Sequence, residues 1–239
     1  MKTQVVLLAG ILTAILFWSN RAGAIAFTGS ANYSTSLAIP DNNSLGVADT
    51  ENFTLTGATS ISSLQVTLDI AGGWNGDYYA YLRHGSSGFA VLLNRVGVTG
   101  SGQFGYGDSG FNVTFSDNAA NGDIHSYQNV ASFGGGTVTG AWQPDGRNVD
   151  PSLITGLTPR TAMLSSFTAM DPNGAWTLFV SDNSPVGIGT LDGWGLSVTA
   201  DGSGTSVPDQ GNTFKLLLLS TFVLFLGGWG VRLKQANQY

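Results

Sequence analysis

The feature that most constrains the fold is a period-two alternation of apolar and small or polar residues on both sides of an acidic, glycine-rich loop in residues 171–199. Side chains along a β-strand point alternately to opposite faces, so such alternation predicts a half-buried strand. The apolar positions are Trp176, Leu178 and Val180 before the loop and Trp194, Leu196 and Val198 after it. We therefore expect two strands joined by this loop.

The same pattern recurs between residues 27 and 200. Leu64, Val66, Leu68 and Ile70 alternate with polar residues, and shorter strands are expected at 78–82, 89–93 and 111–115. We find no helical periodicity of useful length in this region. Seven or more short strands separated by turns rich in Gly, Asn, Asp and Ser predict an all-β domain, an antiparallel β-sandwich or jelly roll, over residues 25–202.

The N-terminus has the three parts of a secretory signal peptide. Lys2 precedes an apolar run over residues 5–18, and a small-residue cleavage site, Ala22-Gly23-Ala24, follows. We expect signal peptidase to remove residues 1–24, with cleavage after Ala26 as the alternative. A retained membrane anchor is the other interpretation, but the run is shorter than the roughly 20 apolar residues that a span needs.

The C-terminus is divided in a similar way. We expect a linker and sorting motif at 203–213, a transmembrane helix at 214–232 and a basic cytoplasmic tail at 233–239. Basic residues at both ends, Lys2 and then Arg232 with Lys234, predict that both termini lie in the cytoplasm and that the domain between them is exported.

The sorting motif reads Val207-Pro208-Asp209, followed by Gln210 and Gly211. With the apolar run and basic tail it resembles the PEP-CTERM class of bacterial sorting signals, in its Val-Pro-Asp-x-Gly variant. The resemblance implies recognition by an exosortase and delivery to the cell envelope or cell surface. An ordinary C-terminal membrane anchor is the alternative.

Charge excludes several kinds of partner. Between residues 25 and 206 four Arg oppose thirteen Asp and one Glu, a net charge of 4 − 14 = −10. Such a surface repels nucleic acid and anionic lipid and suits divalent cations that prefer oxygen ligands. Because the chain has no cysteine, an exported fold must be stabilised by packing, hydrogen bonds or bound ions.

Four carboxylates are candidate calcium ligands, each beside Asn or Gly near an expected strand end: Asp41, Asp77, Asp182 and Asp192. Calcium takes about 6 to 8 oxygen ligands and accepts side-chain and backbone oxygens together. The alternative is that these residues cap turns through hydrogen bonds to their own backbone. Asp145 is expected to be a surface residue outside this set.

Catalytic motifs are weak. The tetrapeptide 107–110, Gly-Asp-Ser-Gly, also surrounds the nucleophile of chymotrypsin-like proteases, but such an enzyme needs a suitably placed histidine base. The chain has only His84 and His125. Glycoside hydrolysis by paired carboxylates is disfavoured because Glu51 is the single Glu. We expect no catalytic residues.

An aromatic cluster leaves two interpretations open. Trp74, Tyr78, Tyr79 and Tyr81 could stack on sugar rings in a carbohydrate-binding module. Aromatic residues are also common in strands and in sandwich cores, which favours a core role.

Residues 36–199 resemble the P domain, or Homo B domain, of kexin-like and furin-like proprotein convertases. Six elements occur in the family's order before the closing 171–199 segment: Ile39–Asn43, Asn75–Tyr78, Leu82–Leu93, Gly110–Asp117, Gly140–Pro144 and Leu164–Phe167. Asp117-Asn118 departs from the paired acidic residues that the family tends to carry there.

The resemblance implies a β-sandwich of the kind that follows and stabilises the catalytic domain in convertases. We expect an exported, non-catalytic module with a structural or adhesive role in the cell envelope, where its partner could be a polysaccharide or an envelope protein. The alternatives are an extracellular carbohydrate-binding module and an accessory domain that acts in trans with a separate protease.

Overall fold

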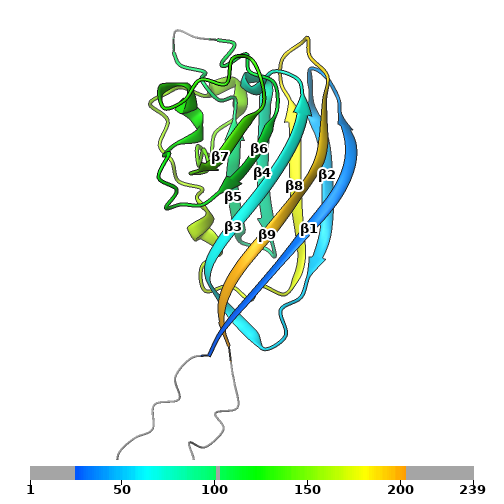
Figure 1. Ribbon diagram of the computed structural model, residues 1–239, viewed down its shortest axis with the longest axis vertical. Coiled ribbons are helices and arrows are strands. Elements are labelled where there is room, and N and C mark those ends of the chain that lie inside the picture. The colour runs from blue at the N-terminus through cyan, green and yellow to red at the C-terminus, as the bar shows by residue number, and fades with distance from the viewer. Residues whose placement is uncertain (1–24, 101–102, 203–239) are drawn as a thin grey trace, which may run out of the picture. The chain divides into compact units, whose positions relative to one another are not determined.

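A computed structural model describes residues 25–100 and 103–202, which lie in one compact unit (Figure 1). The predicted signal peptide with Ala22 and Ala24, the sorting motif, the transmembrane helix at 214–232 and the tail lie outside the described residues. Within the described part, no helix is long and apolar enough to cross a membrane.

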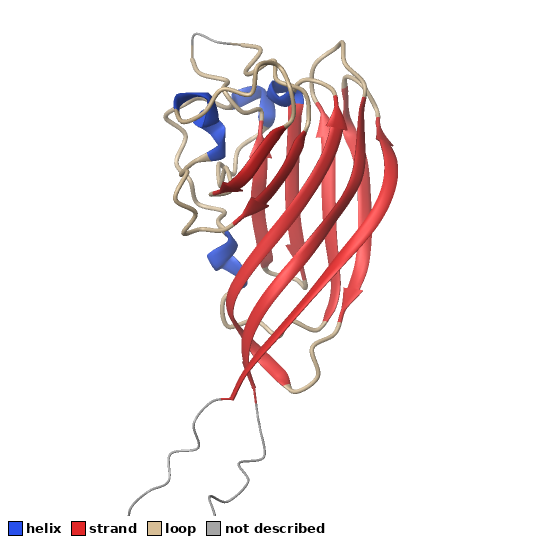
Figure 2. Cartoon of the chain, in the orientation of Figure 1, coloured by secondary structure: helices blue, strands red, loops and turns tan. Residues whose placement is uncertain are grey.

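Two β-sheets pack face to face, as an all-β sandwich requires (Figure 2). The five-stranded sheet has the order β1-β9-β3-β6-β7, formed by β1 (Ile25–Ile39), β9 (Gly189–Gly202), β3 (Ala58–Gly72), β6 (Phe111–Phe115) and β7 (Val138–Trp142). The four-stranded sheet has the order β2-β8-β4-β5, formed by β2 (Asn43–Phe53), β8 (Gly174–Asp182), β4 (Tyr78–His84) and β5 (Gly88–Asn94).

Helical structure in the described residues is limited to short 3-10 segments in the connections: η1 (Asn75–Asp77), η2 (Ile124–Asn129), η3 (Pro151–Leu153) and η4 (Leu164–Phe167). Asp123 caps η2 and Asp150 caps η3, each by accepting a backbone N–H with its side chain. The absence of helical periodicity in the sequence agrees with this low content of helix in the described residues.

The core lies between the sheets and is built by the predicted alternation. Val66, Leu68 and Ile70 of β3 are buried, whereas the intervening Gln65 and Thr67 are exposed. The apolar positions of the two strands around the acidic loop are also buried: Trp176, Leu178 and Val180 in β8, and Trp194, Leu196 and Val198 in β9. The alternation therefore identified the inward faces correctly.

Three strands, β1, β2 and β7, had no clear period-two signal. In β1 the half-buried Phe27, Ala31 and Tyr33 pack against the core, but the register shifts between Ser34 and Leu37. A bulge of this kind interrupts the alternation that identifies a strand. In β2 only Phe53 is buried, and in β7 only Val138 and Trp142 are, so neither strand carries an alternating apolar face.

The sandwich is also not wholly antiparallel, because β6 and β7 pair in parallel. Parallel neighbours need a long crossover, and residues 116–137, which contain η2, provide it. The remaining strand pairs of both sheets are antiparallel, as predicted.

Candidate functional site

Three segments that are distant in the sequence meet where β4 begins and β8 ends. Tyr78 and Asn43 are both register partners of Asp182, so the start of β4 and the start of β2 flank the end of β8. η1 places Asp77 directly before β4, and the Asn183 N–H donates to the Asp77 carbonyl at 2.9 Å. The fold therefore brings the carboxylates of Asp77 and Asp182 together.

These two carboxylates are buried and incompletely satisfied. Asp77 and Asp182 have no exposed surface, and neither Oδ1 nor Oδ2 of Asp77 accepts a well-aligned hydrogen bond, although the Ser184 side chain lies near enough to lower its pKa. Asp182 Oδ1 accepts the Ser184 N–H at 3.1 Å, whereas its Oδ2 has no partner. Three carboxylate oxygens thus lie in the interior without a well-aligned donor, with only the Ser184 side chain near Asp77 and the Asn42 N–H near Asp182. Such an arrangement costs free energy unless a positive charge compensates it.

The surroundings raise the pKa of both groups. Burial, and then the charge of Asp182, raise the pKa of Asp77 from 3.8 to about 6. Burial raises the pKa of Asp182, and the charge of Asp41 adds to this effect. Two carboxylates that share a site in this way need either a proton or a cation at neutral pH.

Arg95 supplies only part of that charge. Its Nη2 lies 4.0 Å from Asp77 Oδ1, beyond hydrogen-bonding distance. The guanidinium instead donates to backbone carbonyls, from Nε to Gly76 at 3.2 Å and from Nη2 to Gln103 at 3.1 Å. One cation therefore faces Asp77 and Asp182, with the exposed Asp41 nearby.

The four predicted calcium ligands separate into two places. Asp41, in the turn between β1 and β2, is close enough for its charge to raise the pKa of both buried carboxylates. Asp192 is elsewhere: it is exposed on β9 and its charge acts on Asp69 of β3. Residues 25–100 and 103–202 contain no three His, Cys, Asp or Glu side chains grouped as a metal site.

Asp145 is not the surface residue that the sequence suggested. It is fully buried, with its Oδ2 2.7 Å from His125 Nδ1 and its Oδ1 3.2 Å from Arg147 Nη1. Arg147 also binds Asp123 Oδ2 at 2.8 Å. The charge is tolerated in the interior because each member of this network has a charged partner.

Neither histidine has a ring nitrogen free to act as a base. His125 contacts Asp145 through Nδ1 and the Val98 carbonyl through Nε2, at 2.9 Å. Both ring nitrogens of His84 contact backbone carbonyls. In the Gly-Asp-Ser-Gly tetrapeptide, Asp108 accepts hydrogen bonds from Tyr127, Gln128 and Gly135. These groups hold loops in place and form no nucleophile–base pair.

The aromatic cluster does not form one surface. Tyr78 is buried, and its hydroxyl donates to the Gly72 carbonyl at 2.9 Å. Trp74 is 44% exposed near η1. Tyr79 and Tyr81 are half-buried on the outer face of the four-stranded sheet, where Tyr81 stacks on Phe179 with 4.8 Å between the ring centroids. Only Tyr79 and Tyr81 remain together.

Sequence reasoning missed two residues at the Asp77–Asp182 site, Arg95 and Ser184. The run Asp182-Asn183-Ser184 carries a signal, since Asp commonly accepts the N–H two residues ahead in a turn. Arg95 carries no local signal, because only the tertiary fold brings the end of β5 beside η1.

The fold is thus that of a mixed-sheet β-sandwich with a carboxylate pair at one end. The family described as the proprotein convertase P-domain matches residues 150–198, which include η3, η4, β8 and most of β9. The match supports the resemblance over the closing segment and leaves residues 36–149 outside it.

Two solved structures are similar in outline. One is the serine protease of Aeromonas sobria (ASP) with the chaperone ORF2, at 13% identity and TM-score 0.39, over 76% of this chain and 28% of that chain. The other is the serine protease of Aeromonas sobria, at 12% identity and TM-score 0.41, over 74% and 27%. This chain thus spans less than a third of either. No curated protein shows significant sequence similarity to it.

Proposed function

We propose that this chain is an exported, non-catalytic β-sandwich module of the bacterial cell envelope with a structural or adhesive role. We propose further that calcium neutralises the carboxylates of Asp77 and Asp182. Export is supported by the sequence at the two ends of the chain, and a non-catalytic role is supported by the engaged ring nitrogens of His84 and His125.

The observation that supports calcium is the set of three buried carboxylate oxygens without a well-aligned donor on Asp77 and Asp182. Two amides or two apolar side chains would avoid this cost, so a carboxylate pair is best explained by a cation that it binds. Oxygen ligands favour calcium over zinc, and the chain has no cysteine.

The rest of the coordination shell would come from oxygens at the same place. The exposed Asp41 is one candidate, and the side chain of Ser184, which is close enough to Asp77 to lower its pKa, is another. Backbone carbonyls and water are ordinary calcium ligands as well. A cation in this position would connect the β1–β2 turn, η1 and the end of β8.

Thermal unfolding tests the calcium proposal. A ligand that binds only the folded state stabilises it by about 2.7 kcal/mol at one hundred times its dissociation constant. The melting temperature should therefore rise with calcium and fall with chelator. Asp182→Asn should flatten this response, whereas Asp192→Asn, a matched change at an exposed position, should preserve it. An equal response to calcium, magnesium and matched ionic strength would refute the proposal.

A second candidate function is an accessory module that acts in trans with a separate protease. The P-domain match over residues 150–198 favours it. It predicts that a protease co-purifies with this chain from envelope extracts and loses thermal stability when the chain is removed. Purification of the chain without any protease from the native host would count against it.

A further inference from the structure

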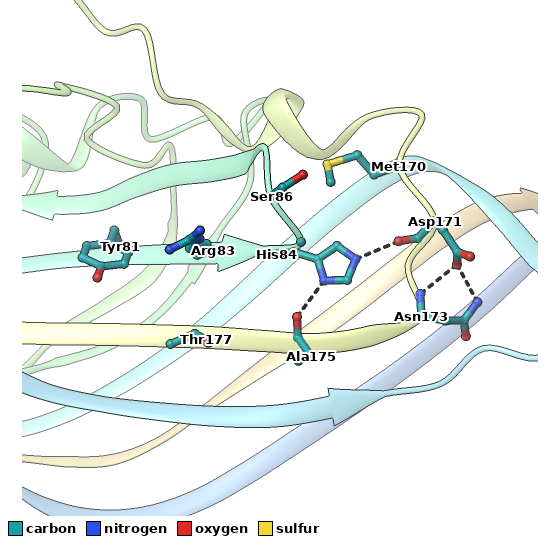
Figure 3. A pocket seen from close by; sticks show the side chains of 10 residues that line it. Tyr81, Arg83, His84, Ser86, Met170, Asp171, Asn173, Ala175 and Thr177 are labelled. Atoms are coloured by element: carbon teal, nitrogen blue, oxygen red, sulfur yellow. Dashed lines mark hydrogen bonds between the residues drawn. The ribbon is translucent and has the colours of Figure 1, made fainter.

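An open pocket of about 650 Å³ lies on the outer face of the four-stranded sheet, at the opposite end of β4 from Asp77 (Figure 3). We call it the outer-sheet pocket and define it by Tyr81, Arg83, Ser86, Met170, Asp171 and Thr177. Its volume is in the range of small-molecule sites. No candidate site predicted from the sequence coincides with it, although Tyr81 belongs to the predicted aromatic cluster.

One wall of the pocket is a rigid aromatic surface. Tyr81 and Arg83 face outward on β4, where their register partners on β8 are Phe179 and Thr177. Tyr81 stacks on Phe179 with an interplanar angle of 17° and also packs against Phe89, with 5.2 Å between the centroids. Packing against Phe179 and Phe89 fixes the Tyr81 ring, so a ligand would meet, already in place, the part of this half-buried ring that the two neighbours leave uncovered.

The far wall is held in place by His84 (Figure 3). Its Nδ1 lies 2.9 Å from the Ala175 carbonyl on β8, and its Nε2 lies 2.8 Å from the Asp171 carbonyl. The ring also stacks on the buried Trp176, with centroids 4.0 Å apart. These contacts hold residues 170–173 against the end of β4, so this wall of the pocket is preformed.

Several polar groups in the pocket can still form hydrogen bonds or ion pairs with a ligand. Arg83 is exposed and makes no ion pair within residues 25–100 and 103–202. Asp171 Oδ1 accepts from the backbone and side chain of Asn173, which leaves Oδ2 available. The Ser86 and Tyr81 hydroxyls can each donate and accept. The pocket therefore offers donors, acceptors and one charge of each sign beside an apolar surface.

We propose that the outer-sheet pocket binds a neutral glycan of more than one sugar, with one sugar packed against Tyr81 and hydroxyls further along the glycan hydrogen-bonded to Arg83 and Asp171. Paired donors and acceptors beside an aromatic surface suit a ligand rich in hydroxyls. A net charge of −10 over residues 25–206 disfavours polyanionic polysaccharides. This inference names a ligand for the proposed adhesive role and rests on that role.

Affinity gel electrophoresis of the full chain in mild detergent tests the proposal. The probes are three neutral polysaccharides, hydroxyethylcellulose, galactomannan and dextran, and one acidic polysaccharide, alginate. At least one neutral probe should retard the protein, and alginate should not. Arg83→Ala should weaken retardation about tenfold, equivalent to about 1.4 kcal/mol. Arg83 is exposed, so this variant should melt at the wild-type temperature.

A second variant and a matched control complete the test. Tyr81→Ala should also weaken binding, whereas Trp74→Ala, which removes a half-exposed aromatic ring near η1, should have no effect. Failure of all three neutral probes, preference for alginate, or retention of binding in Arg83→Ala would overturn the proposal. A calcium-dependent melting temperature with no glycan binding would leave the proposed calcium-stabilised module standing and remove only its ligand.

Discussion

Replacing Asp77 by Asn should stabilise the protein at neutral pH when calcium is absent. Asp77 is fully buried, and neither of its carboxylate oxygens has a well-aligned hydrogen-bond donor. Burial, and then the charge of Asp182, raise its pKa from 3.8 to about 6 although the Ser184 side chain lowers it. At about 1.36 kcal/mol per pH unit, that difference corresponds to about 3 kcal/mol of unfolding free energy. Asn removes the buried charge, so the variant should gain up to this amount.

The pH dependence follows from the direction of the pKa change. Between pH 3.8 and about 6 the folded wild-type protein holds a proton that the unfolded chain has lost, so its stability falls as pH rises. Below pH 3.8 the Asp77 carboxyl is protonated in both states, and wild type and variant should differ little. Above pH 6 the full difference should be present.

Urea unfolding from pH 3 to pH 8 in chelator measures this difference directly. In saturating calcium the order should reverse, because the wild type gains a bound cation and the variant loses one ligand. Asp192→Asn is the matched control and should follow the wild type in both conditions. An Asp77→Asn protein that is less stable than wild type at pH 7 in chelator would refute the argument that Asp77 is a buried, uncompensated charge.

Three further predictions concern other parts of the chain. Trp176→Ala should cost about 3 to 5 kcal/mol in chemical denaturation, because the buried indole also donates to the Pro172 carbonyl; a loss under about 1 kcal/mol would contradict the packing of β8. Burial alone would lower the pKa of His125, but its hydrogen bond to Asp145 and the charge of Asp145 raise it, and the net shift is upward from 6.5. The contribution of His125 to the free energy of unfolding should therefore decline as pH rises above 6.5, and this decline should vanish in His125→Gln. Terminal sequencing of envelope material should show loss of residues 1–24, and an intact Met1 would contradict this step. Intact-mass measurement should show cleavage near Val207 in a host with an exosortase and not in a host without one; Tyr239 retained equally in both hosts would contradict this second step.

Local sequence determined most of the strands and their inward faces. In β3, β8 and β9 the alternation alone identifies the apolar positions that face the core, because a strand has only two faces and one of them must be apolar. It does not show that Ser181 of β8 and Gly195 of β9, on the other face, are also buried. It failed where a bulge shifts the register of β1, in β2, where only Phe53 is buried, and in β7, where only the two end residues are buried. Nor could it show that β6 and β7 run parallel, since strand direction depends on where the crossover at 116–137 returns the chain.

The candidate site residues were determined by tertiary structure to a greater extent than the strands were. The sequence identified Asp41, Asp77, Asp182 and Asp192 as one group by their similar local settings, but the fold brings three of them to one end and leaves Asp192 beside Asp69. Burial of Asp145 and exposure of Trp74 were likewise undetermined by neighbouring residues. A side chain's charge environment and exposure depend on strands that are distant in the sequence, so only the packed sheets decided which carboxylates lack partners and which aromatic rings face solvent.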